Sequence, residues 1–153
     1  MTPMRYFTLA LMLLSFSAIA DEECIFDEAA QEEFTTQYLA SHKDAGIDKD
    51  GTIIISREGE MIQFQRGGCE HFGIYIESTI SHSYTEQEFF DKVIALVEEF
   101  GHELVDAQEL RDALAANQWQ IIDDIYFVQI DRVASFEMEH DGKGGIYVGF
   151  YIN

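Results

Sequence analysis

Apolar and polar residues alternate along six short stretches of the chain, and each stretch predicts a β-strand with one buried face. Strands of this kind form an antiparallel sheet whose apolar side faces a core. The apolar positions are Ile53 and Ile55; Ile62 and Phe64; Phe72, Ile74 and Ile76; Val128 and Ile130; Phe136 and Met138; and Ile146, Val148, Phe150 and Ile152.

Two helices are predicted by matching N-terminal signals. Thr85 and Asp106 are N-cap residues, and a glutamate three positions after each can return the hydrogen bond. The first helix is expected to end before Gly101, and the second is expected to run to about Asn117. The first helix carries an apolar stripe made of Phe89, Val93, Leu96 and Phe100.

A third helix is expected earlier in the chain, where Asp27 can act as N-cap. Ala30, Phe34 and Tyr38 recur there at four-residue spacing, and the pattern fades near His42. The fold class is therefore α+β, with three helices and about six strands in an antiparallel sheet. The expected core consists of Phe72, Ile74, Ile76, Val148, Phe150 and Ile152, packed against Phe89, Val93 and Leu96.

The order of helices and strands suggests an internal repeat. Residues 66–76 and 143–152 share a basic residue followed by two glycines, and then a strand, Gly-Ile-Tyr-Ile in one and Gly-Phe-Tyr-Ile in the other. We expect one compact domain over residues 21–153, and the repeat suggests two α-β-β-β halves at residues 24–80 and 84–153. Chance similarity between glycine turns is the alternative.

Residues 1–20 have the features of a secretory signal peptide. They combine one positive charge, an apolar run and a small-x-small cleavage site that ends at Ala20. The mature protein is therefore expected in the periplasm or outside the cell, without stable membrane insertion. Lipidation is not expected, because Cys24 does not directly follow the cleavage site.

The chain has two cysteines, Cys24 and Cys69. An exported chain meets an oxidising environment, so a single disulfide between them is the favoured interpretation. A catalytic pair of Cys69 with His71, and a metal site, are the alternatives. Glu70 argues against the catalytic pair, since a reactive thiolate needs a cationic setting.

Removing the signal peptide leaves 8 basic and 29 acidic residues, a formal charge of −21. Nucleic acids and anionic membranes are disfavoured as ligands, because both require a cationic surface. Two interpretations of the charge stay open. It can serve solubility alone, or it can attract a basic protein.

No residue pattern indicates a metal, a cofactor or a catalytic residue. The segment from Asp48 to Ile53 resembles the centre of a calcium-binding loop, but Arg57 stands where the bidentate carboxylate would be. A polar turn before a strand is the favoured interpretation. Enzyme signatures such as a nucleophile elbow or a phosphate-binding glycine loop are absent from the sequence.

The strands around residues 71–77 and 147–151 place tyrosines opposite the apolar set. We expect this face to bind a partner, with tyrosines providing contact area and the mid-strand glycines leaving room for the partner's atoms. The alternative is that a helix covers the face. The candidate partner-binding residues are His71, Tyr75, Glu77, Tyr147 and Tyr151.

The favoured function is an exported acidic binding protein that occludes a cationic enzyme or toxin. In its architecture and charge the chain resembles periplasmic inhibitors and immunity proteins, although it matches no motif of theirs. Two alternatives are a small periplasmic hydrolase with an unrecognised carboxylate site and a self-associating structural module. The oligomeric state stays open.

The disulfide gives a direct test. Mass spectrometry of the non-reduced mature protein after alkylation should find a peptide cross-linked through Cys24 and Cys69 and no alkylated thiol. In the chain-entropy model a bridge closing a loop of this length stabilises the fold by about 4 kcal/mol, so reduction should lower the melting temperature. Two alkylated cysteines in protein isolated from an oxidising compartment would contradict the bridge.

Overall fold

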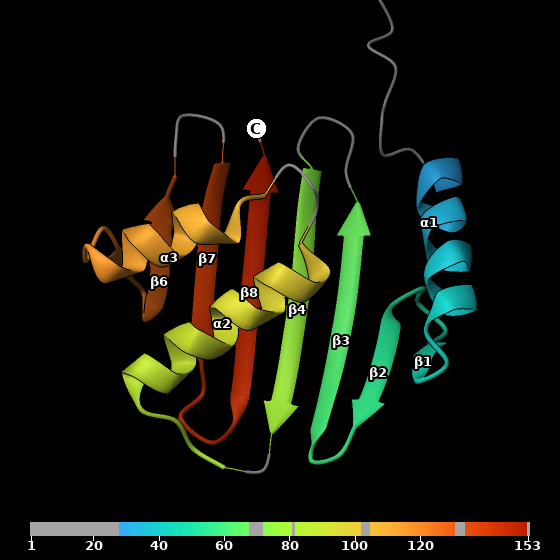
Figure 1. Ribbon diagram of the computed structural model, residues 1–153, viewed down its shortest axis with the longest axis horizontal. Coiled ribbons are helices and arrows are strands. Elements are labelled where there is room, and N and C mark those ends of the chain that lie inside the picture. Colours follow the sequence, from blue (N-terminus) through green and yellow to red (C-terminus); the bar gives the residue numbers. More distant parts are fainter. Residues whose placement is uncertain (1–27, 68–71, 81, 102–104, 131–133, 153) are drawn as a thin grey trace, which may run out of the picture.

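An eight-stranded antiparallel sheet is the centre of the structure (Figure 1). The computed structural model describes residues 28–67, 72–80, 82–101, 105–130 and 134–152. The strands lie in the order β1-β2-β3-β4-β8-β7-β6-β5. In chain order the elements are α1 (Glu28–Ser41), β1 (Ala45–Ile47), β2 (Ile53–Arg57), β3 (Glu60–Gly67), β4 (Phe72–Ile80), α2 (Glu86–Phe100), α3 (Ala107–Ala115), β5 (Gln120–Ile122), β6 (Ile125–Gln129), β7 (Ala134–His140) and β8 (Gly145–Ile152).

The α+β class and the helix-plus-antiparallel-sheet arrangement are confirmed, but the expected number of about six strands is wrong. The two additional strands, β1 and β5, have three residues each and lie at the two edges of the sheet. Three residues are too few to show a period of two. The β5–β6 turn also lacks the glycine that usually marks such a turn. Asp123 and Asp124 adopt its positive φ angles, 50° and 68°, in place of glycine.

The strand order is symmetric about its central pair. Strands β1–β4 form one meander and β5–β8 form another, and β4 pairs with β8. Ile74 lies opposite Phe150, and these two residues hold corresponding positions in the two Gly-x-Tyr-Ile segments. A duplicated unit would produce this order. The duplication stays a prediction, and the helices are unequal, one before the first meander and two before the second.

The ends of α2 follow the predicted signals. Thr85 Oγ1 accepts a hydrogen bond from the Glu88 backbone N–H at 3.3 Å, and Glu88 Oε2 accepts one from the Thr85 N–H at 2.8 Å. The helix ends before Gly101, as expected. The N-cap of α3 is Asp106, and α3 ends at Ala115, slightly earlier than expected. No helix among the described residues is long and apolar enough to cross a bilayer.

The three helices lie on one face of the sheet (Figure 1). The ring of Phe64 on β3 contacts both Phe34 of α1 and Phe100 of α2, with centroid separations of 5.9 and 5.5 Å. Near the other edge, Phe89 of α2 lies 5.5 Å from Tyr126 of β6. The apolar faces of the strands and of α2 therefore form one continuous core.

Most of the expected core residues are buried between α2 and the sheet. Ile152 is partly buried against it, and the side chain of Phe72 lies outside the described part of the structure. The buried residues among those predicted are Ile74, Ile76, Phe89, Val93, Leu96, Val148 and Phe150.

Helix α1 is attached less firmly, because none of its residues is buried. It contacts the sheet through Phe34 and Tyr38, and the guanidinium carbon of Arg66 lies 3.8 Å from the centroid of the Phe34 ring. A groove of about 610 Å³ remains beside α1, and both Glu28 and Arg66 line it. The expected N-cap residue, Asp27, lies outside the described residues.

Cys24, Cys69 and His71 also lie outside the described residues, so the disulfide stays a prediction.

The turn between β7 and β8 is fixed against the end of β4. Ile80 donates its backbone N–H to the Gly144 carbonyl at 3.0 Å, and a Cβ atom on Gly144 would overlap the Ile80 carbonyl oxygen. Gly144 also has a φ of 122°, a value that residues with a side chain rarely adopt. Within the turn, Asp141 Oδ1 accepts hydrogen bonds from the backbone N–H groups of Lys143 and Gly145 at 2.7 and 2.9 Å.

Two alanine substitutions separate the cost of a positive φ angle from the cost of a close contact between Gly144 and Ile80. Gly142 has a φ of 69° with no atom within 4 Å of an added Cβ, so Gly142→Ala should cost about 1–2 kcal/mol. Gly144→Ala adds the overlap with Ile80 and should cost at least about 3 kcal/mol, measured by chemical denaturation. Equal losses for the two variants would contradict the close approach.

Candidate functional site

The sheet face opposite the helices, hereafter the open face, carries four of the five predicted partner-binding residues. Alternation and strand register place Tyr75 and Glu77 of β4 beside Tyr147 and Tyr151 of β8. Tyr75 is 40% exposed, Glu77 is exposed, and the other two tyrosines are half-buried. None of the described helices covers them. Their role in binding stays a prediction, and the fifth residue, His71, lies outside the described residues.

Tyr147 stands between two carboxylates. It pairs with Glu77 on β4 and with Glu139 on β7, so the three side chains form one row across the open face. Neighbouring strands lie about 4.8 Å apart, so a glutamate occupies the neighbouring strand position on each side of Tyr147. Both glutamates are exposed, and neither has a hydrogen-bond or ion-pair partner among the described residues.

Tyr75, Tyr147 and Tyr151 contact one another, and we call them the tyrosine cluster. The Tyr75 ring lies 5.7 Å from Tyr151 in an edge-on arrangement and 6.3 Å from Tyr147. The Tyr151 hydroxyl donates to Glu137 Oε2 at 3.4 Å. Burial raises the pKa of Tyr147 and, with hydrogen bonds to Tyr75 and Tyr147, that of Tyr151. These two phenols are therefore neutral and hold their protons at physiological pH.

The mid-strand glycines have a different role from the one expected. A Cβ atom on Gly73 would lie 3.3 Å from Cε2 of Tyr75, and one on Gly149 would lie 3.1 Å from the Tyr147 hydroxyl and 3.2 Å from Cε2 of Tyr151. The space above each glycine is therefore occupied by the protein's own rings. The expectation that it is free for a partner's atoms is wrong.

The open face carries charge of one sign. Glu77, Glu137 and Glu139 point to it from β4 and β7, and no described strand residue on this face is a lysine or arginine. The formal charge of the whole chain is −20. The open face thus carries a group of tyrosines bordered by carboxylates.

Sequence reasoning missed Glu137 and Glu139 as members of this surface. Their alternation with the buried Phe136 and Met138 already placed them on the polar side of a strand. The pairing of β7 with β8, which brings them beside the tyrosine cluster, joins residues about ten positions apart and depends on the strand order. A hairpin register for residues 134–152 would have identified them.

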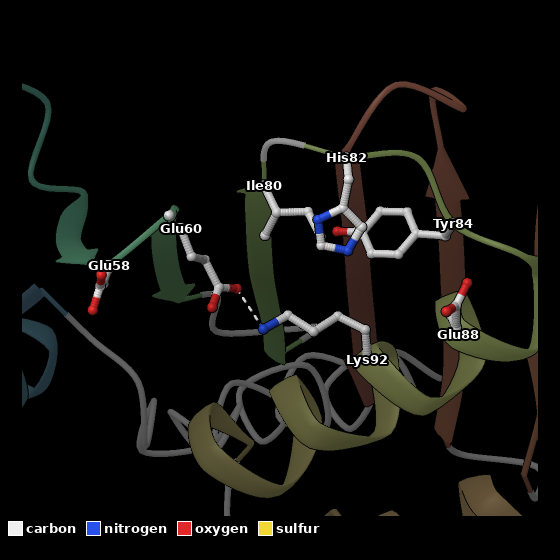
Figure 2. Close-up of a pocket in the computed structure, with 8 residues that line it drawn as sticks. Glu58, Glu60, Ile80, His82, Tyr84, Glu88 and Lys92 are labelled. Carbon is white, nitrogen blue, oxygen red and sulfur yellow. Dashed lines mark ion pairs between the residues drawn. The ribbon is translucent and has the colours of Figure 1, made fainter.

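A polar hollow of about 490 Å³ lies on the helix side, beside the first turns of α2 (Figure 2). It is a concave feature of the kind that a hydrolase with a carboxylate site would need, so its side chains bear on the enzyme alternative. The residues that line it are Glu58, Gly59, Glu60, Ile80, His82, Tyr84, Glu88 and Lys92.

The central charged groups of this hollow are already paired. Lys92 Nζ lies 2.5 Å from Glu60 Oε1 (Figure 2). The same oxygen accepts a hydrogen bond from the buried Ser78 hydroxyl at 2.6 Å. Glu88 caps α2, and its hydrogen bonds from Thr85 lower its pKa. A general acid needs the opposite shift, because it must hold a proton near neutral pH.

Tyr84 is a further polar group of the hollow, which Glu58 and His82 also line. Its hydroxyl donates to the Gly144 carbonyl at 3.3 Å. Burial, together with the charges of Glu60 and Asp141, raises the pKa of Tyr84 to about 12. The hydroxyl is therefore a weak acid that ties α2 to the β7–β8 turn, and it is not suited to activate a nucleophile.

The segment that resembles a calcium loop is a turn. Asp48 Oδ1 accepts hydrogen bonds from the backbone N–H groups of Asp50 and Thr52 at 2.8 and 3.0 Å. Gly51 has a φ of 83°, and Ile53 then begins β2. Within the described ranges, no three His, Asp or Glu side chains are grouped as metal ligands would be.

Comparison of the chain with family models, with curated proteins and with solved structures finds no match.

The glycine–tyrosine contacts lead to a test with a matched control. Gly149→Ala should displace Tyr147 and Tyr151, since the added Cβ meets the flexible ends of both side chains. The tyrosine signals in near-ultraviolet circular dichroism should change, while the free energy of unfolding should change by no more than about 1 kcal/mol. Gly67→Ala, on the same face with no atom within 4 Å, should leave those signals unchanged. Identical spectra for both variants and the unaltered protein would contradict the packing of the rings against Gly149.

Proposed function

We propose that the chain is an exported acidic binding protein whose open face occludes a cationic enzyme or toxin. The observation that carries the proposal is the tyrosine cluster on a sheet face that no described helix covers, bordered by Glu77, Glu137 and Glu139. Tyrosine rings give large contact area at low entropic cost, and the carboxylates select a partner of opposite charge.

The charge decides which class of partner fits. A second copy of the chain would bring two open faces of the same sign together, which costs energy unless cations neutralise them. Nucleic acid and anionic lipid surfaces are repelled for the same reason. A basic protein is attracted over a distance of about one Debye length, which is about 8 Å at physiological salt.

The two kinds of group have separate effects on binding. The carboxylates accelerate encounter, because a field of one sign steers an oppositely charged partner before contact. The tyrosine cluster slows dissociation, because its rings lose their water on binding and pack against the partner. Export by the predicted signal peptide would place this surface where secreted basic enzymes and toxins are met.

A second candidate, self-association through the sheet edges, is favoured by one observation. Ile121 and Ile122 on the edge strand β5 are 54% and 52% exposed, and an edge strand presents unpaired backbone groups. The adjacent Asp123 and Asp124 place like charges at the same edge, which opposes pairing with an identical copy. We therefore rank this candidate below the binding of a basic partner.

A kinetic comparison of two triple variants tests the proposal. A basic protein is captured from periplasmic and secreted fractions and its enzymatic activity is assayed with and without the chain. Its association is then measured with Glu77, Glu137 and Glu139 changed to glutamine. The association rate should fall by about tenfold at low salt and lose most of its salt dependence, while dissociation changes little.

The control removes the same charge elsewhere. Glu32, Glu58 and Glu109 are exposed residues outside the open face, and their triple glutamine variant should keep most of the association rate. Equal losses in the two variants would show that net charge alone acts. Full enzymatic activity of the captured partner in the complex would contradict occlusion.

A further inference from the structure

We infer that the open face binds an arginine side chain of its partner, with the guanidinium group against the Tyr75 ring and paired with Glu77. The inference rests on the proposed function and deepens it, because it names the chemical group that the open face recognises. It follows from comparing a site where a ring and a carboxylate bind a guanidinium group with a pair, Tyr75 and Glu77, that shares one face of a strand.

The first place already holds a guanidinium group. Arg57 Nη1 donates to Glu99 Oε2 at 2.8 Å, and Nη2 contacts the other carboxylate oxygen of Glu99. The guanidinium carbon lies 5.8 Å from the centroid of the Phe100 ring. The hydrogen bond to Glu99 raises the pKa of Arg57. A ring and a bidentate carboxylate thus bind the cation together.

The second place has the ring and the carboxylate without a cation. Tyr75 and Glu77 are two positions apart on β4, so their side chains leave the same face of the strand from Cα atoms about 7 Å apart. Tyr75 is the most exposed tyrosine that the structure describes, at 40%. Glu77 has no hydrogen-bond or ion-pair partner among the described residues. Both groups are therefore available to a partner.

A second tyrosine and a second glutamate lie beside Tyr75 and Glu77. Tyr147 lies directly across from Glu77, and its ring is tilted 40° to that of Tyr75 with 6.3 Å between centroids. Glu139 stands on the far side of Tyr147. A cation placed on Tyr75 is thus bordered by a second ring, and Glu139 adds negative charge beyond that ring.

A guanidinium group fits better than an ammonium group. It is planar, stacks on an aromatic face, presents a fork of donors that matches a carboxylate, and is weakly hydrated. The Tyr75 ring does not stack on its neighbours face to face, since Tyr151 meets it at 84°. A lysine offers a compact, strongly hydrated charge, so it should bind more weakly at the same place.

Three short peptides test the inference: acetyl-Gly-Ser-Arg-Ser-Gly-amide and its counterparts with lysine or citrulline in place of arginine. Each is titrated at physiological salt against the full mature chain, and the ring signals of the tyrosines are followed by nuclear magnetic resonance. The arginine peptide should shift the Tyr75 and Tyr147 signals. The lysine peptide should bind severalfold more weakly, and citrulline, which is uncharged, should produce no saturable shift.

Four variants locate the contact. Tyr75→Leu and Glu77→Gln should each weaken binding of the arginine peptide by about three- to fivefold. Tyr75→Phe keeps the ring and should bind as the unaltered chain does. Glu58→Gln removes an exposed carboxylate at the polar hollow on the helix side and should also have no effect. Glu77 is exposed on the sheet surface, so its variant gives a result even if Tyr75→Leu fails to fold.

The outcomes separate this inference from the proposed function. Equal binding of the arginine and lysine peptides, unaffected by Tyr75→Leu or Glu77→Gln, overturns the inference while the acidic open face still serves to attract a basic partner. Loss of binding in Glu58→Gln moves the site to the hollow and also overturns it. The proposed function fails separately, if no basic protein associates in a salt-dependent way through Glu77, Glu137 and Glu139.

Discussion

The antiparallel pairing of β4 with β8 constrains the rest of the structure. It joins the two meanders into one sheet, and its register determines both faces at once, because successive side chains point to opposite sides. Ile74 and Phe150 meet beneath the helices, while Tyr75 and Gly149 meet on the open face. A slip of one residue would expose the apolar side and bury the tyrosines. The core and the tyrosine cluster are thus two results of one register.

The features of the fold and of the open face that could be predicted from the sequence are those marked by residues close together in the chain. Alternation predicted the six longer strands, and capping residues predicted the start of α2, since both patterns lie within a few positions. The edge strand β5 was missed because it is short and because Asp123 and Asp124 form a turn that usually contains glycine. The place of Glu139 beside Tyr147 was missed, because it depends on the register of the β7–β8 hairpin, which alternation within one strand does not determine. Gly149 was predicted on the correct face, but its contact with Tyr151 depends on side-chain rotamers.

The acidic residues divide into those with partners and those without. Glu60 and Glu99 bind Lys92 and Arg57 on the helix side, where they connect α2 to the hairpin of β2 and β3. On the open face, Glu77 has no partner within the described residues. The basic residues that form ion pairs do so on or near the helices and turns. The charge that remains on the open face weakens the fold by self-repulsion, and it is the charge that a basic partner would neutralise.

The loose attachment of α1 has a consequence for how the structure opens. Since α1 has no buried residue and is held mainly by Phe34 and Tyr38, its detachment exposes much less apolar surface than unfolding the sheet does. It should therefore exchange its amide hydrogens through a local opening, while β4 and β8 exchange only when the whole domain unfolds. That opening uncovers Phe64, a side chain only 2% exposed in the closed form. A protease would gain access there, and the surface carrying the tyrosine cluster would still be folded.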